Sequence, residues 1–239
     1  MSTSGTYTWT MNLQSLVNAA LRKLAVLSGG SSPESFEVTN ATEALNALIA
    51  GFQADGMPIW KLDTLYFDTE AGNPLYTIGQ GLSGPGTVNN VVPLKIIQAW
   101  RNQGTVKNVP LNIYTMYNYN LLPQTAAHGT PVTLAYQPEA SVGYLALWPA
   151  PQDTSYQILC KYQKPFTDML NLWDEVDFPR YWYEAVIYGL ASRLSREYGI
   201  PVQDRQELKQ EAEMFHQQAL SFGTEEGSLY LQPDTNGKW

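Results

Sequence analysis

The chain has a single cysteine, Cys160, among 239 residues. One thiol cannot form a disulfide within the chain, and it cannot supply a cysteine-based zinc site. Cys160 lies within residues 156–162, an alternating run that is typical of a strand. Because buried cysteine behaves as a small apolar side chain, we expect Cys160 to be an unreactive core thiol.

Basic residues are also few. The chain has 14 lysines and arginines against 22 acidic residues, a net charge of −8, and only 15% of its residues are charged. The densest basic stretches are Arg22–Lys23 and the scattered Lys161 and Lys164. A protein that binds nucleic acid through its phosphates needs a basic patch, so this composition argues against a nucleic-acid-binding protein.

Leader and membrane patterns are absent from the sequence. The first ten residues, MSTSGTYTWT, lack the basic and apolar regions of a secretory signal. No apolar run approaches the roughly 18 residues that a membrane helix needs. We therefore expect a protein of the cytosol, or of an assembly that forms there, with no membrane partner.

One glycine-rich motif resembles a dinucleotide-binding loop but has the wrong context. Residues 79–84, GQGLSG, match G-x-G-x-x-G, which requires a helix directly afterwards and an acidic residue about 20 positions on. Here Pro85 and Gly86 follow, and no acidic residue occurs between Glu70 and Glu139. We interpret the motif as a connection between strands and predict no cofactor.

Histidines and carboxylates form no recognisable catalytic or metal-binding set. His128 and His216 have no histidine or cysteine partner at ligand spacing. Asp174, Glu175 and Asp177 cluster, but they precede a predicted helix, whose N-terminus favours negative charge. We predict no catalytic residues, no metal site and no enzymatic activity.

The period of the apolar residues changes twice along the chain. Residues 13–27 and 41–52 follow a helical period, with Thr10 and Thr39 as expected caps and Gly29–Gly30 and Gly56 as expected ends. Residues from about 59 to 162 alternate with a period of two. Helical patterns return after Asp177, as far as Tyr198, and over residues 208–222.

This order predicts an α+β fold in three parts. Residues 1–61 and 165–223 form an antiparallel helical bundle of two N-terminal and two C-terminal helices. Residues 62–164 form an inserted antiparallel β-sandwich or barrel. Residues 224–239 form an extended C-terminal tail.

The tail has no helical or strand period, yet it carries large apolar side chains. These are Leu229, Tyr230, Leu231 and Trp239. Apolar side chains in an aperiodic segment often mark a docking site, so we predict that they bind another subunit or a partner protein. The alternative is a frayed end without a role.

Aromatic residues on the predicted strands have two interpretations. Such residues can form a sugar-binding face, but alternation turns about half of any set toward the core, and we favour the core. The candidates are Trp60, Tyr66, Tyr76, Trp100, Tyr136, Tyr144 and Trp148.

Several stretches together resemble a family of phage proteins. They are residues 19–27 (AALRKLAVL), 43–60 (EALNALIAGFQADGMPIW), 71–79 (AGNPLYTIG) and 148–151 (WPAP), the last followed by 178–186 (FPRYWYEAV) and 190–194 (LASRL). Their order and their amino-acid sequences resemble those of the head-to-tail adaptor of short-tailed bacteriophages, also called tail tubular protein A or packaged-DNA stabilization protein. The resemblance spans about residues 13 to 198.

The resemblance implies a structural protein of the virion neck, assembled in the host cytoplasm. Such adaptors form a ring of twelve copies below the portal protein, extend the DNA channel, help to retain packaged DNA and receive the tail tube or nozzle protein. DNA would pass through the lumen without sequence-specific binding, which suits an acidic chain. The alternatives are a sugar-binding β module of a phage tail or capsid structure, and an unrecognised hydrolase.

The helix after Pro179 fits a ring for a second reason. From Tyr181 to Ala191 its only charged residue is Glu184, so it has no clean polar face and must be covered on more than one side. We predict that Tyr181, Trp182 and Val186 pack between neighbouring subunits.

Overall fold

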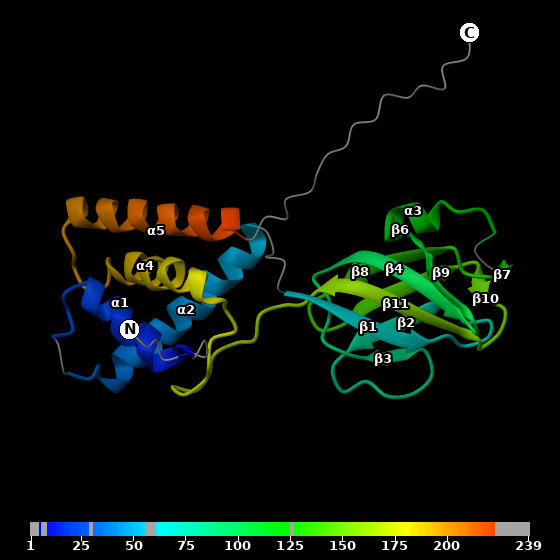
Figure 1. Cartoon of the computed structure of the whole chain (residues 1–239), viewed down its shortest axis with the longest axis horizontal. Helices are drawn as coiled ribbons and strands as arrows, with labels where there is room; N and C mark the ends of the chain where they lie inside the picture. Colours follow the sequence, from blue (N-terminus) through cyan, green and yellow to red (C-terminus); the bar gives the residue numbers. More distant parts are fainter. Residues whose placement is uncertain (1–4, 6–8, 29–30, 56–60, 125–126, 223–239) are drawn as a thin grey trace, which may run out of the picture. The chain divides into compact units, whose positions relative to one another are not determined.

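The structure is a computed structural model that describes the whole chain except residues 1–4, 6–8, 29–30, 56–60, 125–126 and 223–239 (Figure 1). The chain divides into two compact units. The helical unit comprises Met1–Gly51 and Asp168–Trp239, and the β unit comprises Phe52–Thr167. The predicted mixed α+β class is confirmed. The predicted docking residues Leu229, Tyr230, Leu231 and Trp239 lie outside the described residues.

The helices have the expected order but different ends. They are α1 (Leu13–Lys23), α2 (Ser35–Asp55), the short α3 (Met116–Asn120), the 3₁₀ turn η2 (Arg180–Trp182), α4 (Tyr183–Leu194) and α5 (Val202–Phe222). Asn12, not Thr10, caps α1, because its side-chain oxygen accepts the Ser15 N–H at 2.9 Å. α1 ends before the glycines because Ala25 takes a left-handed conformation, with φ of 56°.

The predicted start of α2 at Thr39 is also wrong. The helix begins one turn earlier, where the Glu37 carboxylate accepts the backbone N–H of Glu34 at 2.8 Å. This reach back to the N-terminal turn satisfies a donor that the helix itself leaves without a partner. The acidic residue Glu37 therefore marks the start of α2. The apolar stripe begins later in the helix and could not reveal that start.

Helix α4 occupies the centre of the helical unit. It contacts α1 and α5, and in Figure 1 it lies between α5 and the N-terminal helices. Its glycine, Gly189, allows close approach of α2, since a Cβ there would lie 2.9 Å from the Leu48 side chain. The side chains that α4 buries are Tyr183, Ala185, Val186, Ile187, Leu190, Ala191 and Leu194.

The β unit contains two large sheets. The four-stranded sheet has the order β1-β11-β4-β5, formed by Leu62–Asp68, Tyr156–Gln163, Lys95–Gln103 and Val106–Pro110. The five-stranded sheet has the order β3-β2-β9-β8-β6, formed by Thr87–Asn89, Leu75–Gly79, Gly143–Trp148, Thr133–Pro138 and Asn112–Thr115. A short pair joins β7 (His128–Gly129) and β10 (Ala150–Pro151). One core takes Phe67, Ile158 and Cys160 from the first sheet and Ile78 and Leu145 from the second.

The expectation of purely antiparallel sheets is wrong. Strands β2 and β3, β6 and β8, and β7 and β10 pair in parallel. Alternation fixes which face a residue occupies but carries no information on strand direction. Between β2 and β3, Gly81, Gly84 and Gly86 all have positive φ, which lets a short loop bring the chain back to run in the same direction. The glycine motif is thus a strand connection, and β3 rather than a helix follows it.

Cys160 lies on β11 in this shared core, as predicted. Its side chain is fully buried, and burial raises the pKa of the thiol to about 12. We expect the folded chain to resist a thiol-specific reagent at neutral pH, because the reactive thiolate is neither formed nor accessible. The measurement is the time course of labelling in buffer, with the urea-unfolded chain as the fully reactive control. Rapid stoichiometric labelling of the folded chain would contradict the buried position.

None of the helices in the described part of the chain combines the length and the apolar character needed to cross a bilayer.

Candidate interaction surfaces

Two of the three residues predicted to pack between subunits are buried within the helical unit itself. Trp182 is 1% exposed and Val186 is fully buried. The Trp182 ring lies 5.5 Å from that of His216 on α5 and 6.3 Å from that of Phe178. The apolar character of α4 is therefore explained by its own neighbouring helices, and it no longer argues for a ring contact. The assignment of these residues to a ring stays a prediction.

Tyr181, the third of these residues, is 37% exposed and belongs to an open aromatic patch. Its ring lies 4.5 Å from that of Phe222, which is largely exposed at the end of α5. Next to it, the Arg180 Nε donates a hydrogen bond to the Trp9 carbonyl at 3.0 Å. The exposed Trp9 ring meets the Tyr183 ring edge-on at 5.3 Å. We call Trp9, Tyr181 and Phe222, which are all at least partly exposed, the aromatic patch.

A second exposed surface is the loop of residues 168–174, which we call the docking loop. It presents Leu170, 78% exposed, and Trp173, 73% exposed. Two large, highly exposed apolar side chains in one short loop form a candidate interaction surface. Neither residue follows the helical or strand periods, so period analysis missed both. The available signal was two large apolar residues beside an acidic segment that precedes a helix.

Hydrogen bonds hold the docking loop in shape. The Asp174 carboxylate accepts the backbone N–H groups of Leu170 at 2.9 Å and Asn171 at 2.7 Å. These two donors lower the pKa of Asp174, so the carboxylate stays ionised at neutral pH and the bonds persist. The side-chain amide of Asn46 on α2 bonds both backbone groups of Met169, at 3.0 and 3.2 Å. The loop therefore presents its apolar side chains in a preorganised conformation.

The role expected for Asp174 needs correction. We expected it to meet the positive end of the following helix, but that helix begins only at Arg180. Asp174 instead orders its own loop. Beside this loop, a groove of about 250 Å³ runs along α2, between Val38, Thr42 and Asn46 on one side and Leu170 on the other.

The β unit carries a larger groove, which we call the α3 groove. It has a volume of about 540 Å³ and lies beside α3, which contacts β6, β8 and β9. Ala135 and Ala146 lie on the sheet face that points away from the shared core, and their small side chains pack with Tyr119 of α3. The groove is lined by Pro74, Leu75, Met116, Tyr119, Asn120, Gln137 and Tyr144.

The strand aromatics do not form one sugar-binding face. Tyr76 is buried in the shared core, and Trp100, Tyr136 and Trp148 are half-buried. Tyr66 on β1 and Tyr144 on β9 are exposed, but they belong to different sheets, and each lies on the face away from the shared core. Trp60 lies outside the described residues. The core interpretation is confirmed for Tyr76. The exposed Tyr66 and Tyr144 do not share one face that could bind a sugar.

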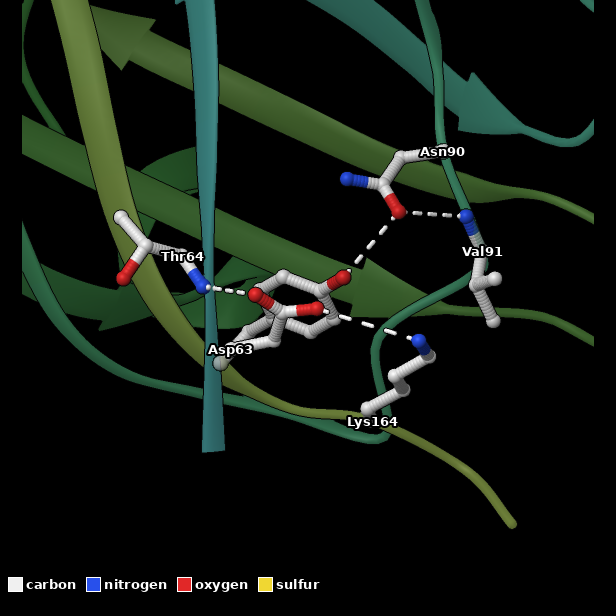
Figure 2. Close-up of polar contacts among 6 residues, drawn as sticks. Asp63, Thr64, Asn90, Val91 and Lys164 are labelled. Carbon is white, nitrogen blue, oxygen red and sulfur yellow. Dashed lines mark hydrogen bonds and ion pairs between the residues drawn. The ribbon is translucent and has the colours of Figure 1, made fainter. Parts of the chain in front are cut away.

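A polar cluster lies beside strands β1 and β11 (Figure 2). Tyr162 donates its hydroxyl to the Asn90 side-chain oxygen at 3.0 Å, and the same oxygen accepts the Val91 N–H at 2.7 Å. Burial is the main cause that raises the pKa of Tyr162, and the nearby Asp63 adds to it. Lys164 lies 3.8 Å from the Asp63 carboxylate, so an acidic partner offsets its charge. The Asn90 contact fastens the loop after β3 to β11, and the ion pair joins β1 to the segment after β11, so both serve the fold.

The net charge is confined to one unit. The β unit contains six acidic and six basic residues and is neutral. The helical unit contains sixteen acidic and eight basic residues, which gives −8. On α5, the acidic side chains Asp204, Glu207, Glu211 and Glu213 are all exposed. Within the described residues, no group of three or more histidine, cysteine or carboxylate side chains could hold a metal ion.

Comparison with known proteins identifies the family. A family model described as SU10 adaptor protein matches residues 11–229, which is most of the chain and includes both units. This match confirms the resemblance to a phage head-to-tail adaptor. No curated protein matches the chain.

Proposed function

We propose that this chain, which belongs to the SU10 adaptor protein family, is the head-to-tail adaptor at the neck of a phage virion. In this proposal it forms a ring on the portal protein, extends the DNA channel, helps to retain packaged DNA and receives the tail tube or nozzle protein. The observation that carries the proposal is the family match over residues 11–229. The description of the family as an adaptor also makes an enzyme a poor alternative.

The distribution of charge supports a conduit for DNA. Because the whole net charge of −8 belongs to the helical unit, we infer that this unit lines the channel. A surface of like charge repels phosphates and gives passing DNA no place to bind. In a ring of twelve copies the effect is repeated twelve times. The neutral β unit would then lie away from the DNA.

The exposed apolar side chains support contacts between proteins. In a ring, each subunit binds the next through two different surfaces. The aromatic patch is one candidate for such a surface on the helical unit, and we assign the docking loop to the portal. We retain the inserted β domain of residues 62–164, with two facing sheets, and the docking tail of residues 224–239 as parts of the proposal.

Sedimentation with the portal protein of the same phage tests the function. We expect the chain to co-sediment with portal rings at a fixed stoichiometry, and to sediment separately from a portal of an unrelated phage. A chain that remains free in the presence of its own portal would contradict the adaptor function. Binding to a glycan array without portal binding would favour the sugar-binding alternative.

A further inference from the structure

We propose that the α3 groove of one subunit binds the C-terminal segment, residues 224–239, of another copy of this chain. The inference rests on the proposed function, because a ring brings copies of the chain side by side. It adds a site and an occupant that the adaptor function does not specify.

The groove has the chemistry of a peptide site. Its volume of about 540 Å³ is within the usual range for ligand sites, about 300–1,000 Å³. Pro74, Leu75, Met116 and the two tyrosines supply apolar surface, and none of the lining residues is charged. Asn120 and Gln137 each add an amide that can both donate to and accept from a peptide backbone. Leu75 remains 54% exposed, so the groove is uncovered in the described structure.

The C-terminal segment matches the groove in length and sequence. The 16 residues 224–239 follow closely on Phe222, where α5 ends, and a fully extended chain of that length spans about 50 Å. The segment can therefore extend well beyond the end of α5. The segment contains Leu229, Tyr230 and Leu231 in succession, between Ser228 and Gln232. Such a run offers alternate side chains to an apolar groove and its backbone to the amides.

Charge favours the β unit over the helical unit as the binding partner. The segment contains Glu225, Glu226 and Asp234 against a single Lys238, so its side chains carry −2. Without the segment, the helical unit still carries −6 and repels an acidic chain, whereas the β unit is neutral and the groove lining has no charge. Electrostatic repulsion of this kind selects between two otherwise available surfaces.

Photo-crosslinking in the full chain tests the site. Tyr230 is replaced by p-benzoylphenylalanine, and rings are assembled on the portal from an equal mixture of ¹⁴N- and ¹⁵N-labelled chains. After irradiation, mass spectrometry identifies the linked peptides. We expect links to peptides that contain Leu75, Met116 or Tyr144, and we expect about half of the linked pairs to combine the two isotopes.

Matched substitutions then test the groove itself. Leu75→Glu places a charge in the groove and should lower the crosslink yield about tenfold or more. Tyr66→Glu, at a site of similar exposure (58%) on the other sheet, should change the yield less than about twofold. Tyr144→Arg provides a second groove variant, and thermal unfolding establishes that each variant is folded.

The outcomes separate this inference from the proposed function. Rings that form but link Tyr230 only within one chain, only to the portal or outside the groove overturn the inference and leave the adaptor function intact. Equal losses for Leu75→Glu and Tyr66→Glu also overturn it. If no ring forms on the portal, both the proposed function and the inference fail.

Discussion

Replacing Trp182 with alanine is expected to lower the free energy of unfolding by about 3–5 kcal/mol, the usual cost of truncating a buried tryptophan. The side chain is 1% exposed and packs against the rings of Phe178 and His216 at the centre of the helical unit. Its loss leaves a cavity that the surrounding helices can fill only partly. Chemical unfolding followed by the helical circular dichroism signal measures the effect on this unit.

The neighbouring residue provides the control for Trp182. Tyr181→Ala removes an aromatic ring of the same helical turn that is 37% exposed, and it should cost about 1 kcal/mol or less. Similar small losses for both variants would show that Trp182 is not part of the protomer core. In that case Trp182 would again be a candidate for a contact between subunits.

The double substitution Leu170→Gln and Trp173→Gln is expected to abolish co-sedimentation with the portal while leaving the fold intact. Both side chains are largely exposed, so the free energy of unfolding should change by less than about 0.5 kcal/mol. An apolar anchor that is buried on binding contributes about 2 kcal/mol or more, which corresponds to roughly 30-fold in Kd for each anchor. Repetition around a ring multiplies the loss.

Val202→Gln is the matched control for the docking loop. Val202 is also an exposed apolar residue of the helical unit, but it lies at the start of α5, away from the docking-loop segment in sequence. Its substitution should leave portal binding within about twofold of the unchanged chain. If the double variant binds the portal as well as the unchanged chain does, the assignment of the docking loop to the portal contact is wrong.

The sequence predicted the elements better than their ends. The apolar stripe of α1 is recovered in Leu13, Leu16, Val17, Ala20 and Leu21, because a helix that packs on a core must repeat at three and four residues. The end of α1 is set by the left-handed backbone at Ala25, which no apolar pattern reveals. Local backbone conformation of a residue other than glycine is decided by the surrounding fold.

Strand direction and the exposed surfaces were the parts least accessible from sequence. Leu134 and Leu145 lie in the shared core, at alternating positions of β8 and β9, but alternation could not show that β6 and β8 run in parallel, with α3 in the connection between them. The helix after Pro179 was recognised as apolar on more than one side, yet the sequence could not tell whether its partners belong to the same chain. Trp182 demonstrates the difference, because the helices of its own unit bury it.

Electron microscopy of the chain bound to its portal tests the central claim most directly. The account predicts a closed ring of this chain on the portal, with the acidic helical unit toward the DNA channel and the neutral β unit away from it. A chain that forms no ring on the portal, or a ring whose channel is lined by the β unit, would contradict the account.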